Sequence, residues 1–176
     1  ARFTPYGLKS TALSACYAMA ETTFAVTQTS PGSPPLVLRA SKEGLSQGRY
    51  QPCEEVGLYR DCVSSGQPIS GCAIRVIDPE GTPLSDGQIG EILIQSASLF
   101  TGYRNQPKLT EAALQGDWYR SGDYGFTWRG ECFVIGRKKD LIIVAGKNIY
   151  PEDVEAVVNQ VPGVSPGRVV AFAVED

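Results

Sequence analysis

Short apolar runs separated by turn residues fill the centre of this 176-residue chain, and they constrain its fold more than any other feature. Residues 73–78 (AIRVID) and 88–95 (QIGEILIQ) flank the turn-rich stretch PEGTPLSDG, which predicts a β-hairpin. Two further runs, 118–127 (WYRSGDYGFT) and 131–136 (ECFVIG), follow at close spacing. Short strands at such spacing favour a small antiparallel barrel or a curled sheet over residues 66–138.

The residues before this β-rich part are less regular. Residues 1–29 predict a short helix, a strand that ends at Tyr17, a turn, and a second strand at 22–29. In residues 30–65, SPGSPP opens a loop and LVLRAS (36–41) predicts a short strand. The polar stretch SKEGLSQGRYQPCEEVG shows no clear period, so we expect it to be an irregular excursion.

A new unit is expected after Gly136, where the charge rises in RKKD and the apolar run LIIVAG follows. Pro151 suits the first position of a helix, and Glu152 and Asp153 in the first turn suit its dipole. An apolar stripe at helical spacing continues the helix: Val154, Val157, Val158 and Val161. Residues 169–174 (VVAFAV) predict a strand. Together these patterns predict a mixed α/β chain whose last unit is too short to close its own core.

Composition and charge exclude several classes of function. With 42% hydrophobic and 20% charged residues, the chain has the balance of a soluble globular protein. A net charge of -3, with scattered Lys and Arg, argues against nucleic-acid binding. No apolar stretch approaches a membrane span, and we expect a cytoplasmic protein. Five cysteines without a C-x-x-C pair predict reduced thiols. The sequence contains no histidine, so chemistry must rest on carboxylates, Lys, Arg and backbone groups.

Three short stretches hold residue types suited to nucleotide binding. In YRSGDYG, the Asp123 carboxylate could accept from both hydroxyls of a ribose, although an Asp after a Gly more often stabilises its own turn. In IGRKKD, Arg137 offers a planar fork to a ribose or phosphate oxygen, or else belongs to a solvated basic face. In CYAMAETT, Tyr17 could stack on a base, Ala18 allows close approach and Glu21 could bind magnesium. A Tyr and a Glu near a turn are, however, usually just core and surface.

These stretches occur in one order, joined by GEILIQSASLFTGYRNQP and followed by AGKNIYPEDVE. The chain thereby resembles the adenylate-forming superfamily, which includes acyl-CoA synthetases, adenylation domains of peptide synthetases, luciferases and fatty acyl-AMP ligases. The resemblance covers about Phe3 to Asp176 and is most specific in DWYRSGDYGFTWRGECFVIGRKKDLIIVAGKNIYPEDVE. It implies the C-terminal part of the large ATP-binding domain in residues 1–138, with a β-barrel-like subdomain, and then the hinge and the beginning of an α+β lid domain in residues 139–176.

The resemblance also implies a role for each candidate residue. Nucleotide contacts fall to Tyr17, Ala18, Asp123, Ile135 and Arg137, the magnesium ligand to Glu21, the hinge to Lys139, and the lid loop to Gly146 and Lys147. Tyr17 would stack on adenine, Asp123 would hold both ribose hydroxyls, and Arg137 would contact the ribose or the phosphate. Many members read Tyr-Gly-x-Thr-Glu where this chain reads Tyr-Ala-Met-Ala-Glu. The Thr hydroxyl that contacts phosphate is therefore missing, although fatty acyl-AMP ligases commonly have Ala there.

An activity for the parent protein follows from the same resemblance. It would use ATP and Mg²⁺ to convert a fatty acid or another carboxylic acid into an acyl-adenylate. The acyl group would then pass to a phosphopantetheine thiol, either of an acyl carrier protein or polyketide or peptide synthase carrier domain, or of coenzyme A. The phosphate loop is expected upstream of Ala1 and the catalytic lid lysine downstream of Asp176. The chain alone is therefore expected to hold no catalytic residue and to be inactive.

Residues 30–65 bear on the subfamily. This stretch, with FTPYGLKSTALSACYAMAE and KKDLIIVAGKNIYPEDVE, resembles fatty acyl-AMP ligases more than acyl-CoA synthetases. In those ligases an insertion at this place packs near the lid and disfavours transfer to coenzyme A. Leu45, Val56 and Leu58 are apolar anchors that favour folding of the stretch back onto the domain. The alternatives are a variable surface loop here, and for the whole an acyl-CoA or aryl-CoA synthetase, an amino-acid adenylation domain or a non-catalytic β-rich binding module.

Overall fold

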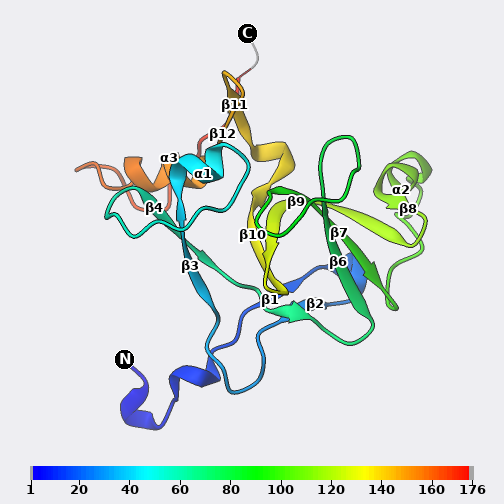
Figure 1. Cartoon of the computed structure of the whole chain (residues 1–176), viewed down its shortest axis with the longest axis horizontal. Coiled ribbons are helices and arrows are strands. Elements are labelled where there is room, and N and C mark those ends of the chain that lie inside the picture. Colours follow the sequence, from blue (N-terminus) through cyan, green and yellow to red (C-terminus); the bar gives the residue numbers. More distant parts are fainter. Residues whose placement is uncertain (1, 175–176) are drawn as a thin grey trace.

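The structure is a computed structural model that describes residues 2–174, and a five-stranded antiparallel sheet forms its centre (Figure 1). Its strands follow the order β10-β9-β7-β6, with β8 paired to β9. They are β6 (Cys72–Ile77), β7 (Gly90–Ser96), β8 (Leu114–Gln115), β9 (Trp118–Trp128) and β10 (Glu131–Arg137). β6 and β7 form the hairpin predicted for residues 73–95, and β9 and β10 confirm the two later strands.

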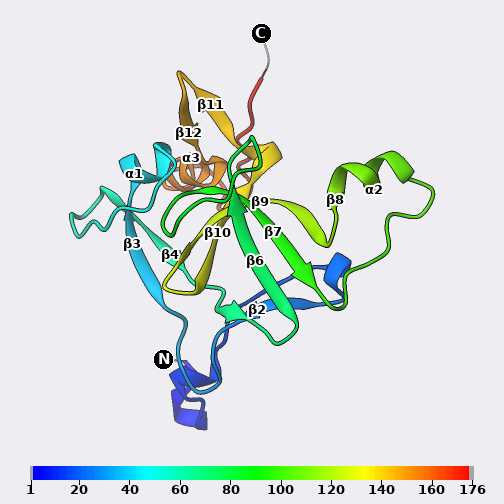
Figure 2. The same ribbon diagram turned by 45° about the vertical axis from the view of Figure 1, so that its right-hand side comes forward.

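Three smaller antiparallel sheets surround the central one (Figures 1 and 2). One joins β1 (Cys16–Ala18), β2 (Ala25–Gln28) and β5 (Gln67–Pro68). The second pairs β3 (Val37–Ser41) with β4 (Tyr59–Val63), and the third pairs β11 (Ile142–Val144) with β12 (Lys147–Ile149). The mixed α/β class with a curled β-rich centre is therefore confirmed.

The helices are short. Among residues 2–174, four are 3-10 helices: η1 (Thr4–Tyr6), η2 (Ser10–Ala12), η3 (Ala20–Thr22) and η4 (Lys138–Asp140). In the same range, three are α-helices: α1 (Lys42–Ser46), α2 (Pro107–Ala113) and α3 (Pro151–Val158). Pro151 opens α3 as predicted, with Glu152 and Asp153 in its first turn. Within residues 2–174 no helix has the length and apolar character needed to cross a membrane.

Two hydrophobic clusters pack on opposite faces of the central sheet, because neighbours such as Cys132 and Phe133 of β10 point in opposite directions. The first cluster comprises Ala40, Leu45, Cys62, Ile89, Phe126, Phe133, Ile135 and Tyr150. The second comprises Tyr17, Val26, Val76, Ile92, Ile94, Tyr119 and Cys132. The first cluster holds residues of β3, α1 and β4, and the second holds residues of β1 and β2. The small sheets therefore cover the two faces of the central one.

Residues 30–65 are more ordered than the sequence predicted. The expected short strand is present as β3, but the stretch expected to be irregular (residues 41–57) holds α1, and β4 follows it. The side chain of Ser41 caps α1 by accepting from the Gly44 amide at 3.3 Å. Of the three predicted anchors, Leu45 is fully buried, whereas Val56 is 87% and Leu58 is 53% exposed, so two of them were wrong.

The strand predicted for residues 169–174 is absent. An isolated apolar run becomes a strand only when a neighbouring strand takes up its backbone hydrogen bonds. Among the described residues, nothing forms a ladder with this run, although its Ala171 amide donates to the Glu155 carboxylate at 2.9 Å. The single helix expected before Tyr17 is likewise replaced by two 3-10 turns, η1 and η2.

Candidate functional site

The centre of the candidate site is a bulge in β9. Residues 121–123 of β9 stand where a regular antiparallel ladder with β7 would place one residue. Gly122 adopts φ 70°, a left-handed conformation that glycine tolerates without strain. The Asp123 amide donates to the Ser121 hydroxyl at 3.0 Å, which closes the bulge. Bulges of this kind re-aim side chains, and this one turns the Asp123 side chain into the protein.

Asp123 joins three strands. Its Oδ2 accepts from the Tyr17 hydroxyl of β1 at 2.5 Å, and its Oδ1 lies 2.9 Å from Nε of Arg137 at the end of β10. Asp123 is only 5% exposed and Tyr17 8%, whereas the Arg137 side chain is largely open to solvent. Three of the five residues predicted to contact the nucleotide, which lie far apart in the sequence, are thus in direct contact through their side chains.

Burial controls the ionisation of this group. It raises the pKa of Asp123, against the opposing effects of the Tyr17 hydrogen bond and the Arg137 charge. Burial also raises the pKa of Tyr17, and the Asp123 carboxylate raises it further. Tyr17 therefore remains a hydroxyl donor over the physiological range. Asp123 is thus a partly desolvated acceptor, with the neutral Tyr17 hydroxyl as donor on one oxygen and the solvent-exposed Arg137 cation on the other.

A cavity of about 360 Å³ adjoins this group and connects it to Glu21. Eleven residues line it: Glu21, Glu91, Tyr103, Leu109, Ala112, Ala113, Tyr119, Arg120, Ser121, Gly122 and Arg137. The Tyr103 hydroxyl donates to Glu21 Oε1 at 2.8 Å and lies 3.1 Å from the Tyr119 hydroxyl. Glu21 and Arg137, 116 positions apart in the printed sequence, therefore face one hollow.

The donor set suits a magnesium ion that arrives with its ligand. Among residues 2–174 no group of three His, Cys, Asp or Glu side chains could enclose a metal by itself. Glu21 offers one carboxylate, fixed on one oxygen by Tyr103. Magnesium is commonly held by one or two carboxylates with phosphate oxygens and water completing the shell. Glu21 fits that pattern.

The other predicted residues lie around this group or apart from it. Ala18 follows Tyr17 in β1. Ile135 occupies a bulge in β10 and packs in the first hydrophobic cluster, on the face of the sheet opposite Tyr17. Lys139 is exposed in η4, two residues beyond Arg137. Gly146, with φ 76°, and Lys147 lie at the exposed turn of the β11–β12 hairpin. Of the predicted residues, Glu21 and Arg137 line the cavity, whereas its lining does not include Tyr17, Ala18, Asp123, Ile135, Lys139 or this turn.

Comparison with known proteins identifies the family. The sequence profile described as "AMP-binding enzyme" matches residues 2–104, more than half of the chain. The chain belongs to the AMP-binding enzyme family. It is 38% identical over 99% of its length to a 4-hydroxyphenylalkanoate adenylyltransferase of Mycobacterium marinum and 36% identical, also over 99%, to the long-chain-fatty-acid–AMP ligase FadD26 of Mycobacterium tuberculosis. The predicted superfamily is confirmed.

Structural similarity agrees with this family assignment. A structure from a study of fatty acyl-adenylate ligases of E. coli and L. pneumophila matches 97% of the chain with a TM-score of 0.87 at 29% sequence identity. The chain spans about 30% of the two mycobacterial relatives, with 30% and 32% covered, and 31% of that solved chain. It therefore corresponds to about a third of an AMP-binding enzyme.

The sequence did not predict one ion-pair group in this chain. Glu91 of β7 is buried and contacts both Arg120 of β9 and Lys138 of η4. Glu91 and Arg120 line the cavity, and Lys138 follows Arg137, which pairs with Asp123 across β9 and β10. A signal was present, because a Glu in the apolar run of β7 is a charged residue in a buried strand, and such residues are almost always paired.

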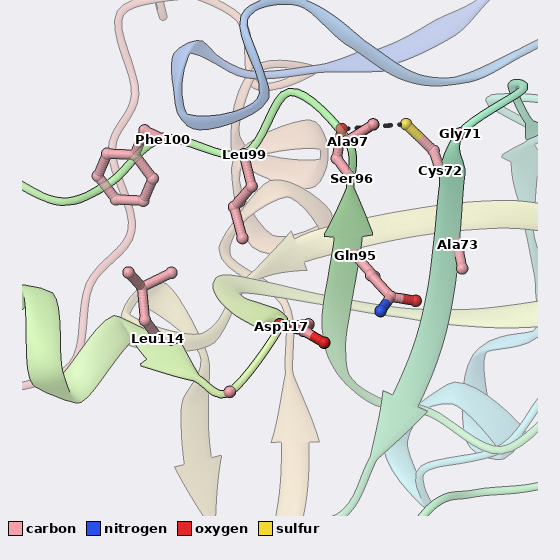
Figure 3. A pocket seen from close by; sticks show the side chains of 11 residues that line it. Gly71, Cys72, Ala73, Gln95, Ser96, Ala97, Leu99, Phe100, Leu114 and Asp117 are labelled. Carbon is pink, nitrogen blue, oxygen red and sulfur yellow. Dashed lines mark hydrogen bonds between the residues drawn. The ribbon is translucent and has the colours of Figure 1, made fainter.

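A second, separate cavity of about 500 Å³ lies on β6 and β7 (Figure 3). Leu99, Phe100 and Leu114 give it an apolar side, and Cys72 lies 3.4 Å from the Ser96 hydroxyl at its rim. It shares no lining residue with the cavity of Glu21 and Arg137 among the residues described. Of these two cavities, the cavity of Glu21 and Arg137 is thus the one that adjoins the Asp123 group.

Proposed function

We propose that the whole protein is an ATP-dependent ligase that converts a fatty acid into an acyl-adenylate and passes the acyl group to a carrier-protein thiol. The observation that carries the proposal is the group of Tyr17, Asp123 and Arg137 at the edge of a cavity that also holds Glu21. Relatives named for forming acyl–AMP or adenylating hydroxyphenylalkanoates support the reaction class. A cytoplasmic location and the fatty acid itself belong to the same proposal.

Asp123 would bind the ribose. A carboxylate offers about four acceptor positions, and Tyr17 and Arg137 use one on each oxygen. The remaining positions can accept from two adjacent ribose hydroxyls, with the base stacked on the aromatic ring of Tyr17 and Arg137 reaching a ribose or phosphate oxygen. Burial strengthens each of these charge-assisted hydrogen bonds, because water competes less for the carboxylate.

Glu21 would hold the magnesium of Mg-ATP, and Tyr103 would orient its carboxylate. When bound, the ion neutralises phosphate charge that otherwise opposes attack by an anion. The carboxylate of the fatty acid forms a bond to the α-phosphorus while the bond to pyrophosphate breaks. In the second step a thiolate bonds to the acyl carbon and AMP leaves. Positioning of the nucleotide by Tyr17, Asp123 and Arg137 serves both steps.

Residues 30–65 would restrain the lid and so favour the carrier-protein thiol over coenzyme A. We place the boundary of the two domains after residue 138 and the pivot at Lys139. The contacts of Arg60 support this assignment: it is the second residue of β4, and its Nη1 lies 3.6 Å from Oδ1 of Asp153 in α3. Figures 1 and 2 both show α1 beside α3. Residues 30–65 therefore contact the unit that would have to move.

The test is a pair of assays on the full-length protein. Fatty acid and ATP are supplied with hydroxylamine, which traps acyl-adenylate as a hydroxamate, and in parallel with either carrier protein or coenzyme A. We expect hydroxamate, acylated carrier protein and little acyl-CoA. Efficient acyl-CoA formation would instead favour an acyl-CoA synthetase, and amino-acid-dependent turnover an adenylation domain. Nucleotide binding without turnover would identify a binding module and refute the proposal.

A further inference from the structure

Glu91 is the most deeply buried carboxylate beside the cavity, at 4% exposure. It lies on β7 and accepts from two cations that come from different elements. Arg120 of β9 contacts both carboxylate oxygens, with its Nε 3.3 Å from Oε1 and its Nη2 against Oε2. Lys138 of η4 places its Nζ 2.9 Å from the same Oε2. One buried acid thus links the central sheet to the 3-10 turn after β10.

The two cations are not equivalent. Arg120 is the more enclosed, with 20% of its side chain exposed, and its planar fork pairs with the carboxylate at both oxygens. Lys138 makes a single contact and is 44% exposed. Burial alone would raise the pKa of Glu91, but the hydrogen bonds from Arg120 and Lys138 outweigh it and the pKa is lowered. Arg120 suffices to keep the carboxylate paired, so Lys138 can leave without stranding a buried charge.

Lys138 is also the residue directly before the proposed pivot. It opens η4, and Lys139 follows it in the same turn. The Lys138 side chain reaches back from this turn to β7, whereas the exposed Lys139 lies beside Asp140, Pro151 and Glu152 in a hollow next to α3. The Lys138–Glu91 contact therefore restricts the φ and ψ changes of η4, on which the orientation of the β11–β12 hairpin depends.

We infer that the Lys138–Glu91 ion pair is a releasable latch that holds η4 against the central sheet and so sets the balance between two orientations of the lid. The inference rests on the proposed pivot at Lys139 and names a positioning pair for that motion. Arg120 keeps Glu91 charged and in place in both orientations. Lys138 pairs with it in the conformation seen here and releases it when η4 turns.

The test uses a graded series at Lys138 in the full-length protein. Lys138→Arg keeps the charge, Lys138→Met removes it at similar length, and Lys138→Glu opposes Glu91. Lys108→Met is the matched control, because Lys108 is exposed on α2 and makes no ion pair among the described residues. Hydrogen–deuterium exchange is measured over residues 138–149 without substrate.

Exchange in these residues should rise by about two- to fivefold in Lys138→Met, the range expected for losing one partly exposed ion pair, and further in Lys138→Glu. Lys138→Arg and Lys108→Met should match the wild type. High salt should speed exchange in the wild type but not in Lys138→Met, since the pair is already gone. Equal exchange in the wild type, Lys138→Met and Lys138→Glu would overturn the latch.

A second readout separates this inference from the proposed function. The ratio of the acyl-transfer rate to the adenylation rate should change by about two- to fivefold in Lys138→Met and recover in Lys138→Arg. A protein with no ligase activity but graded exchange would refute the proposed function and keep the latch. An active ligase whose exchange and rate ratio are the same in all four variants would refute the latch alone.

Discussion

At the scale of single residues, Asp123 is a buried acid. Burial raises its pKa, while the Tyr17 hydrogen bond and the Arg137 charge oppose that effect. Tyr17 donates to one oxygen and Arg137 contacts the other, so neither oxygen lacks a partner before a ligand arrives. A carboxylate that served only its own turn would point along β9 and remain near solvent. The β9 bulge instead turns Asp123 to face β1, which favours a binding role over the local one.

Asp123→Ala in the full-length protein should weaken ATP binding strongly. Loss of a charged acceptor costs about 1.5 to 3 kcal/mol for each hydrogen bond it made, or roughly ten- to a hundredfold in affinity. Calorimetric titration with ATP measures this directly. Asp117→Ala is the control, because Asp117 is exposed in the turn before β9. Equal ATP affinity in both variants would return Asp123 to the role of a turn residue.

Tyr17→Phe should change the pH dependence of nucleotide binding. The Tyr17 hydrogen bond opposes the effect of burial on the pKa of Asp123, so its removal should raise that pKa further. A protonated Asp123 accepts fewer hydrogen bonds, so on acidification ATP affinity should fall at a higher pH in Tyr17→Phe than in the wild type. Affinity titrations between pH 4 and pH 7 test this, with the exposed Tyr6→Phe as control. Superimposed profiles would contradict it.

At this scale the sequence predicted residue types better than positions. Tyr17, Asp123 and Arg137 were named because each carries suitable chemistry, and their order resembled a known family. Their contact depends on the two bulges in β9 and β10, which shift the register and carry no signal in the alternation of apolar residues. Ile135 lies two residues after Phe133, so the ordinary alternation of β10 places it in the first cluster, on the face opposite Tyr17.

At the scale of elements, η4 is the pivot in the proposed function, and the β11–β12 hairpin follows it directly. η4 is a three-residue turn between β10 and β11, and the side chains of Lys139 and Asp140 in it are exposed. A short turn of this kind can absorb a change of φ and ψ without breaking a longer helix. This makes it a better pivot than the ends of α3, where Tyr150 is buried.

Lys139→Pro should retain one half-reaction and lose the other. Proline fixes φ at about -65°, so the protein would keep whichever lid orientation that value permits. Adenylation is measured as hydroxamate formation. Acyl transfer is measured as acylation of the carrier protein from preformed acyl-adenylate. Lys139→Ala is the control, since it removes the side chain and leaves the backbone free, and it should keep both half-reactions. If both half-reactions also survive in Lys139→Pro, the pivot lies elsewhere.

Elements were predictable where local pattern and capping agree. The hairpin of β6 and β7 and the start of α3 at Pro151 follow from turn residues and helix-start chemistry. α1 has five residues, too few for a periodic signal, and Leu45 is buried by tertiary contact with the far end of the chain. Residues 169–174 show the opposite: their apolar pattern predicts a strand, but no strand pairs with them among the described residues.

At the scale of the whole molecule, residues 30–65 connect the central sheet to the last unit. The Tyr150 hydroxyl donates to the Leu45 carbonyl at 3.4 Å, and both side chains share the first hydrophobic cluster. Arg60 lies over the Tyr150 ring, 5.6 Å from its centroid, and donates to the Ile135 carbonyl at 3.2 Å. Its Nη1 is buried, with Asp153 at 3.6 Å, beyond hydrogen-bonding distance. These contacts hold the segment against α3 without a tight ion pair.

This packing can be weakened without deleting the segment. Arg60→Met removes the charge that faces Asp153 and Tyr150 but keeps an apolar side chain against the ring. Arg39→Met is the matched control, because Arg39 pairs with Glu54 and Asp61, both within residues 30–65. Both variants lose one positive charge, but only Arg60→Met loses a contact with α3.

In the full-length protein, Arg60→Met should raise acyl-CoA formation while hydroxamate formation stays close to the wild type. The reason is that the lid turns toward the thiol only for the second step. The proposed restraint by residues 30–65 therefore affects acyl transfer and not adenylation. Shortening residues 30–65 should act in the same direction and more strongly, since it also removes the Leu45 contact with Tyr150.

Acyl-CoA yield and hydroxamate are measured side by side in the wild type, both arginine variants and the shortened form. Arg39→Met should behave as the wild type. If coenzyme A is already an efficient acceptor for the wild type, the segment exerts no restraint and the protein is an acyl-CoA synthetase.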